Sequence, residues 1–129
     1  MEEFSANGSI IQTTRFGAAP PTLSYRAFKQ AWVGCPKSPP AIYVDTRVDN
    51  AVNMTIYISW NGATEYNGWV IRGGSVNGSM DLVERVPKSG FETSVSIPRT
   101  PRVQVQAVMN SRACGYRNGE SYSPIVEVN

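Results

Sequence analysis

The chain has 129 residues, a formal net charge of +2 and 41% hydrophobic residues. This balance suits one folded domain with an apolar core and argues against disorder, and twelve basic against ten acidic residues leave no excess of positive charge for neutralising nucleic-acid phosphates. The chain contains no histidine, the commonest general base and metal ligand. Composition therefore favours a module that is not an enzyme and that uses no cofactor or metal.

The first predicted element is a short strand over residues 9–16, opened by the turn residues Asn7-Gly8. Further along, residues 35–40 read Cys-Pro-Lys-Ser-Pro-Pro, and prolines at this density favour an extended, rigid linker. We therefore expect residues 1–36 to form a strand-containing N-terminal extension and residues 37–129 to form a separate domain.

The second part of the chain alternates apolar and polar residues with a period of two, separated by Gly, Pro and Asn turn signals every eight to twelve residues. No window shows the 3.6-residue periodicity of a helix of any length. This spacing predicts an all-β, seven-stranded antiparallel sandwich. The expected strands cover residues 42–44, 54–60, 69–72, 81–86, 91–97, 102–109 and 124–128.

Two features suggest a secreted protein. There are three Asn-x-Ser/Thr sequons, at Asn7, Asn53 and Asn77, which predict glycosylation, although Asn-Gly-Ser is also ordinary turn chemistry. The only two cysteines, Cys35 and Cys114, have no histidine to complete a zinc site or to activate a thiolate. They are therefore either bonded as a disulfide or present as two free thiols.

The opening residues are acidic and polar and show no signal-peptide pattern, so we expect none within this sequence. No apolar run approaches the length that spans a membrane, and we expect no membrane insertion.

Candidate ligand-binding residues lie in two polar loops of the predicted sandwich. Residues 61–65 connect the second and third strands of this domain, and residues 110–122 follow the sixth. Such loops carry recognition in many sandwiches, although an ordinary loop whose Asn-Gly serves the turn geometry is the more common explanation. If a ligand site exists there, its residues are expected to be Asn61, Thr64, Glu65, Arg112, Tyr116 and Arg117.

Aromatic residues allow two interpretations. Trp60 and Trp69, on neighbouring predicted strands, are expected in or beside the core. Five tyrosines either pair across strands or offer rings that stack on sugars. They are Tyr43, Tyr57, Tyr66, Tyr116 and Tyr122.

The second part of the chain resembles an immunoglobulin or fibronectin type III domain. The resemblance rests on Ser59-Trp60, the strand that begins at Trp69, the alternating segment 103–108 and Ser123-Pro124 before the last strand. The tyrosine that usually opens the sixth strand is absent, because Arg102-Val103 stand there.

This resemblance also bears on the cysteines. In a sandwich of this type the start of the chain lies at the same end as the loop after the sixth strand. Cys35, just before the first strand of the domain, could therefore reach Cys114 in that loop. A disulfide between the two is the pairing that the resemblance implies.

A longer resemblance extends over nearly the whole chain. The strings that carry it are Leu23-Ser24-Tyr25-Arg26-Ala27-Phe28, Trp32-Val33-Gly34, Pro36, Pro39-Pro40, Ser59-Trp60-Asn61-Gly62-Ala63-Thr64-Glu65, Trp69-Val70 and Gly90-Phe91-Glu92-Thr93. In these strings the chain is similar to the C-terminal region of fungal arylsulfotransferase-like secreted proteins, in which a small sandwich follows a β-propeller. The resemblance implies that residues 1–36 correspond to the end of the propeller and its linker.

Bacterial arylsulfotransferases with this propeller use a histidine nucleophile, which this sequence lacks. We therefore expect a secreted, non-catalytic module that binds a protein or glycan surface, of an immunomodulatory or lectin-like kind. The alternative is an accessory domain of an arylsulfotransferase-like propeller enzyme, inactive alone. A homodimer formed through residues 1–36 is a further hypothesis about its partners.

Overall fold

A computed structural model of the chain describes residues 2–14, 17, 30–47, 52–116 and 121–128. The chain divides into two compact units, Met1–Ala31 and Trp32–Asn129. No helix occurs in these described ranges, and accordingly none of their segments is a helix that could span a membrane.

The first unit contains an antiparallel hairpin of β1 (Glu2–Phe4) and β2 (Ile10–Thr13). Its turn is closed by a backbone hydrogen bond from Gly8 N to Ser5 O, 3.0 Å, with Gly8 at a φ of 83° that suits glycine. The sequence predicts one strand over 9–16; the structure has the shorter β2 and an additional β1. Residues 15 and 16 lie outside the described part of the chain.

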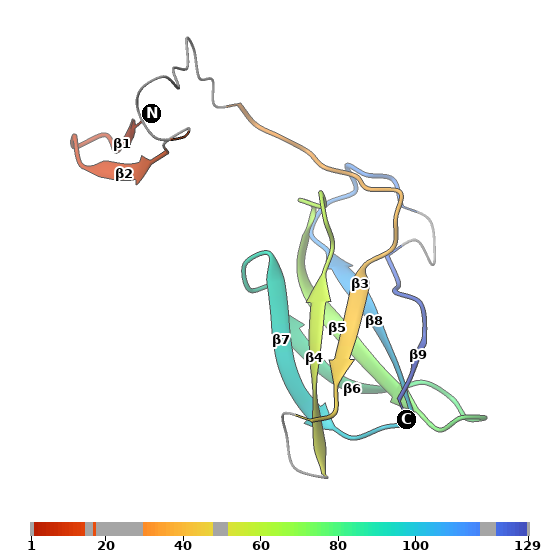
Figure 1. Cartoon of the computed structure of the whole chain (residues 1–129). Helices are drawn as coiled ribbons and strands as arrows, with labels where there is room; N and C mark the ends of the chain where they lie inside the picture. Colours follow the sequence, from red (N-terminus) through yellow and green to blue (C-terminus); the bar gives the residue numbers. More distant parts are fainter. Residues whose placement is uncertain (1, 15–16, 18–29, 48–51, 117–120, 129) are drawn as a thin grey trace. The chain divides into compact units, whose positions relative to one another are not determined.

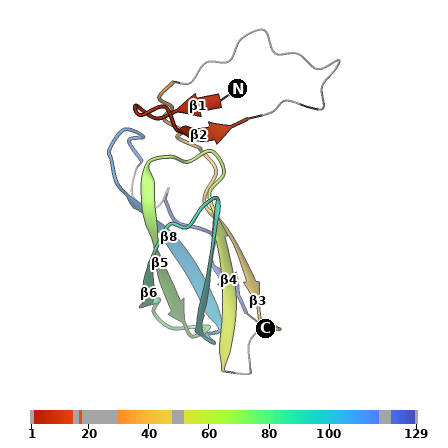
Figure 2. The same ribbon diagram turned by 90° about the vertical axis from the view of Figure 1, so that its left-hand side faces the viewer.

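The second unit is a sandwich of two antiparallel sheets (Figures 1 and 2). One sheet has the order β3-β4-β7 and the other β6-β5-β8-β9. The all-β prediction is confirmed, with seven strands among the described residues of this unit. They are β3 (Ala41–Asp45), β4 (Asn53–Ser59), β5 (Tyr66–Gly74), β6 (Asp81–Pro87), β7 (Glu92–Pro98), β8 (Arg102–Met109) and β9 (Val126–Glu127).

The core lies between the two sheets because each strand turns alternate apolar side chains inward. In β4 every second residue is buried, and β8 shows the same alternation. Trp69 of β5 is fully buried and Trp60 nearly so, as the sequence predicts. The cluster consists of Met54, Ile56, Ile58, Trp60, Tyr66, Trp69, Ile71, Ile97, Val103, Val105 and Ala107.

The strand ends differ most from the expectation. β5 continues through Gly73 and Gly74, where a turn was expected, because both glycines pair with β8. A side chain fits poorly at Gly73, since a Cβ there would lie 2.8 Å from the Thr100 Cγ2 atom. The last strand is only two residues long. Before it, Tyr122 forms an isolated bridge with Gln106, so the chain pairs with β8 on both sides of Pro124.

Candidate functional site

Three segments meet at one end of the sandwich: the linker 32–38, the loop 60–65 and the loop 110–116. We call this region the loop end. Cys35 and Cys114 are joined by a disulfide there, with their Cα atoms 5.3 Å apart, which confirms that prediction. Figure 1 shows the linker that precedes β3 beside the loop that follows β8. The bridge fixes the linker to the sandwich immediately before the first strand of the unit.

The linker also packs directly on the loop between β4 and β5. Gly34 N donates to Thr64 Oγ1 at 2.9 Å, and Thr64 N donates back to Gly34 O at 3.2 Å. Gly34 is buried, and a Cβ at this position would overlap the carbonyl oxygen of Gly62. Only glycine allows the two backbones to approach this closely.

Glu65 connects the two loops of the loop end. Its carboxylate accepts hydrogen bonds from the Ser111 hydroxyl and from Thr64 Oγ1, the latter at 3.0 Å, and its backbone oxygen accepts from Asn110 N at 3.2 Å. The two side-chain bonds favour the charged form, Ser111 most strongly and then Thr64, and hold the pKa of Glu65 below its usual value. Both oxygens of the Glu65 carboxylate therefore accept hydrogen bonds from residues of the loop end itself.

Two aromatic residues tie the linker to the rest of the loop end through their polar atoms. Trp60 Nε1 donates to Ser38 O at 2.7 Å, and the Tyr116 hydroxyl donates to Pro36 O at 3.0 Å. The two rings lie in contact, with centroids 5.1 Å apart. Each polar tip thus satisfies a backbone carbonyl of the linker while the ring packs on its neighbour.

The aromatic contacts continue into the core. Tyr66 lies between Trp60 and Trp69, with centroid distances of 5.8 and 4.8 Å, and Lys88 Nζ lies 4.1 Å from the Tyr66 ring centroid. Burial raises the pKa of Tyr66. These tilted rings, in contact with one another and with few rotatable bonds, form a rigid floor for the loop end.

A hollow of about 310 Å³ opens at the surface of the loop end. Its lining includes the exposed Arg112 and the half-buried Tyr116. It combines a cation with an aromatic and an apolar side chain, and its two hydroxyl groups, on Ser111 and Tyr116, already donate to Glu65 and to Pro36 O. A lining with one cationic and several apolar groups is the kind that binds a polar ligand group. The full lining is Met109, Ser111, Arg112, Gly115 and Tyr116.

Two exposed apolar residues in the linker complete the loop end. Trp32 is 72% exposed and Val33 is 53% exposed, only a few residues before Cys35. Sequence reasoning did not assign them to the site. The string Trp-Val-Gly-Cys could have indicated them, because a disulfide from Cys35 to the loop 110–116 brings the residues just before Cys35 to the loop end.

The structure gives the predicted ligand residues different roles. Asn61 is exposed, whereas Thr64 and Glu65 are half-buried and hold the segments together. Arg112 and Tyr116 are brought together in the hollow. Arg117 lies outside the described residues.

The three sequons lie in different environments. The Asn7 side chain accepts a hydrogen bond from Ser9 N at 3.2 Å and so takes part in the hairpin turn. Asn53 opens β4 and is half-buried, while Asn77 is exposed in the turn between β5 and β6. Asn7 and Asn77 are both exposed, whereas Asn53 is half-buried. Glycosylation at each site stays a prediction.

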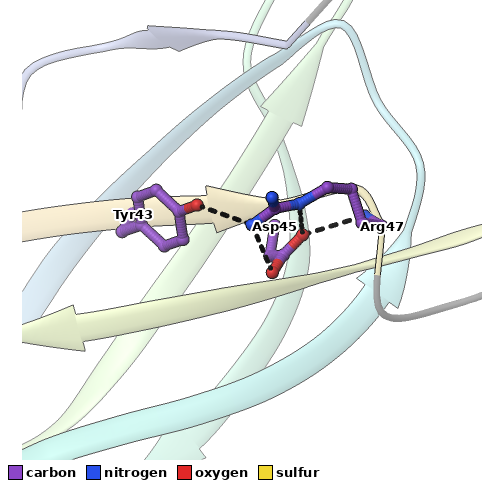
Figure 3. A network of polar contacts seen from close by, with 3 residues as sticks. All are labelled: Tyr43, Asp45 and Arg47. Carbon is purple, nitrogen blue, oxygen red and sulfur yellow. Dashed lines mark hydrogen bonds and ion pairs between the residues drawn. The ribbon is translucent and has the colours of Figure 1, made fainter.

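A second polar cluster follows β3 (Figure 3). The Asp45 carboxylate accepts from Arg47 N at 2.8 Å and from Arg47 Nε at 3.2 Å, and Arg47 Nη2 donates to the Tyr43 hydroxyl at 3.5 Å. These contacts lower the pKa of Asp45, with the Arg47 side chain the largest cause. The three groups thus bond to one another within five residues of the chain, while the Arg47 side chain stays 80% exposed.

No group of three or more Cys, Asp or Glu side chains suited to a metal ion occurs in the described part of the chain. A comparison with protein-family models found no match, and comparisons with curated proteins and with solved structures found none either.

Proposed function

We propose that this chain is a secreted, non-catalytic binding module with an immunoglobulin or fibronectin type III-like topology, which recognises a partner through the loop end. The hollow lined by Arg112 and Tyr116 is the observation that carries the proposal. It opens between backbones that a disulfide, the Thr64–Gly34 pair and Glu65 hold in place. A preorganised surface loses little conformational entropy on binding.

The topology supports this assignment of the surface. The loop after β4 and the loop after β8 connect the second to the third strand and the sixth to the seventh. In immunoglobulin variable domains the loops in these two places belong to the recognition end of the sandwich. Their convergence at the loop end is the arrangement that such a binding role needs.

The composition of the loop end favours a protein partner over a glycan. Exposed Trp and Arg are the residue types that contribute most to protein–protein binding, and Trp32 and Arg112 are both exposed. The Cys35–Cys114 disulfide is compatible with an oxidising, extracellular location, where such bridges persist.

Cell-surface binding tests the proposal. We expect the fluorescently labelled chain to bind cultured macrophages saturably, and binding to fall at least tenfold in Trp32→Ala and Arg112→Ala. Protease treatment of the cells should abolish binding, whereas glycosidase treatment should not. Val76→Ala, an exposed apolar side chain in the turn after β5, serves as the matched control and should bind normally. Unchanged binding by both loop-end variants, or binding lost only after glycosidase treatment, would contradict the proposed protein partner.

A further inference from the structure

A second feature lies on the outer face of the four-stranded sheet, away from the core. Figure 2 shows β6, β5 and β8 side by side in this sheet. A hollow of about 330 Å³ lies over these strands, with Arg72 of β5, Arg85 of β6 and Gln106 of β8 among its lining. Met109 is the one residue that this hollow shares with the hollow at the loop end.

The strand register places four residues in one row across this face. Val70 is paired with Arg85 on one side and with Gln106 on the other, and Gln106 is paired with Tyr122. Paired residues of antiparallel strands point to the same face, and Val70 points outward because its neighbours Trp69 and Ile71 are in the core. The row therefore runs Arg85, Val70, Gln106, Tyr122, over about 14 Å at three strand spacings.

Arg72 lies next to this row. It follows Val70 by two residues on β5, and its side chain is therefore on the same face of the sheet. Within the described residues, the side chains of Arg72, Arg85 and Gln106 form no hydrogen bond or ion pair, although their backbones belong to the strand ladders. Two guanidinium groups and one amide thus share a hollow with their donors unused. Between them Val70 is only 4% exposed and supplies an apolar floor.

We propose that this face binds an acidic saccharide. A carboxylate or sulfate group on the sugar accepts hydrogen bonds from Arg72 and Arg85, whose planar guanidinium groups match the geometry of such anions. The Gln106 amide bonds a ring hydroxyl, and the half-buried Tyr122 offers its ring edge or face to the neighbouring sugar. A cation pair, an amide and an aromatic residue in one row match a chain of charged sugars better than a single small anion.

The simpler alternative is that the two arginines merely cover Val70 with their methylene stems. This alternative predicts that lysine substitutes fully for arginine, because its stem is also apolar. Anion recognition by a planar fork predicts that lysine does not, since it acts only as a point charge.

Titration calorimetry on the full chain distinguishes anion binding from a purely structural role of the two arginines. It also shows whether the bound anion is a carboxylate or a sulfate. The probes are an oligogalacturonate, which carries carboxylates, a heparin-derived oligosaccharide, which carries sulfates, a neutral cello-oligosaccharide and inorganic sulfate. We expect one of the two acidic oligosaccharides to bind, the neutral one not to bind, and inorganic sulfate to bind at least tenfold more weakly.

Single substitutions identify the site. Arg85→Ala, at an exposed position, and Arg72→Ala should each weaken binding of the acidic oligosaccharide about tenfold, the effect of one charge-assisted hydrogen-bonded contact. Arg72→Lys and Arg85→Lys should bind the acidic oligosaccharide more tightly than the alanine variants but more weakly than the parent chain. Tyr122→Ala should weaken oligosaccharide binding and leave sulfate binding unchanged. Circular dichroism and thermal unfolding check that each variant is folded.

Arg99→Ala is the matched control, because it removes one positive charge from an exposed position just after β7 that lines neither hollow, and it should bind the oligosaccharide normally. Equal losses in Arg99→Ala and Arg85→Ala, full rescue by lysine, or binding of neither acidic probe would overturn the proposal. Calorimetry with purified oligosaccharides does not involve cells, and repeating the macrophage assay with Arg85→Ala removes the contribution of acidic saccharides on the cell surface, so failure here and failure of the loop-end proposal are distinguishable.

Discussion

At the scale of single residues, Glu65 shows how a loop carboxylate acquires a structural role. The sequence places it in a polar loop, where it is a reasonable ligand residue. The structure directs both carboxylate oxygens at hydroxyl groups of its own chain, Thr64 and Ser111. Because these bonds exist only in the folded state, they link the protonation of Glu65 to folding.

The stability of the protein should therefore depend on Glu65 in acid. Its folded-state pKa lies below the unfolded value of 4.5, so its contribution is fully present above pH 4.5 and is lost as the pH falls through the folded-state pKa. We expect Glu65→Gln to lower the free energy of unfolding at pH 7 and to have a much smaller effect at pH 3. Urea unfolding at the two pH values measures both differences.

Thr64→Val tests the cause, because it removes one of the two bonds that lower the pKa of Glu65. The acid-dependent loss of stability should become smaller in this variant but should not disappear, since the Ser111 bond remains. A Glu65→Gln effect that is the same at pH 7 and pH 3 would contradict the linkage.

At the scale of elements, the linker before β3 behaves as part of the sandwich. It is attached by the disulfide, by two hydrogen bonds between Gly34 and Thr64 and by the side chains of Trp60 and Tyr116. All of these contacts require the linker backbone to lie against Gly62 without an intervening side chain. Gly34 is consequently the position where the loop end is most sensitive to an added methyl group.

Gly34→Ala should destabilise the chain by about 1–3 kcal/mol, the usual cost of overpacking a close contact. Gly62→Ala is the comparison, because nothing lies within 4 Å of a Cβ there and only its φ of 81° opposes alanine. Its cost should be about 1 kcal/mol. Denaturant unfolding of both variants gives the two values; a Gly34→Ala variant as stable as the parent would show that the linker moves away freely.

Much of the fold could be predicted from the sequence, because alternation marks a strand whose one face is buried. All seven strands of the sandwich were expected, and Trp60 and Trp69 were placed in the core. β1 was missed because Glu-Glu-Phe has no pattern of its own and forms a strand only by pairing with β2. The last strand was overestimated, since Pro124 provides no N–H for the ladder.

Only those parts of the candidate site that follow from the order of the strands along the chain could be predicted. The two loops and the disulfide follow from the sandwich topology, but the partners of Thr64 and Glu65 depend on where the linker backbone runs. The row that includes Arg85 and Gln106 depends on register, because a slip of one residue would turn each side chain to the other face. The alternation of apolar residues indicates which face each side chain occupies, but it does not show which residues of neighbouring strands lie opposite each other.

At the scale of the whole molecule, the hairpin of the first unit has an exposed apolar surface. Phe4 and Ile10 are paired across the two strands, and they are 54% and 57% exposed. An isolated two-stranded hairpin is marginally stable in water and gains stability when its apolar face is covered. A second copy of the same hairpin is a self-complementary cover, which is the basis for the predicted homodimer.

We expect the chain to dimerise at micromolar concentration and the variant Phe4→Thr/Ile10→Thr to be monomeric. Threonine keeps strand propensity while removing apolar surface, so the hairpin itself should persist. Light scattering coupled to size-exclusion chromatography measures the mass. Val76→Thr, which changes an exposed apolar residue of the second unit, should leave the dimer intact. A monomer mass for the parent chain would contradict the predicted homodimer.

The disulfide also determines how the molecule transmits mechanical force. It joins residues 79 positions apart, one before β3 and the other after β8. A pull on the chain outside the two cysteines therefore passes through the sulfur–sulfur bond, and strands β3 to β8 carry no tension. About 270 Å of extended chain is withheld from stretching, at roughly 3.4 Å per residue. Within the sandwich only the segment after Cys114, which contains β9, can be peeled away. A tethered copy would therefore keep its core and the Arg72, Arg85 and Gln106 part of the outer face under load until the bridge is reduced, whereas Tyr122 would leave with the peeled segment.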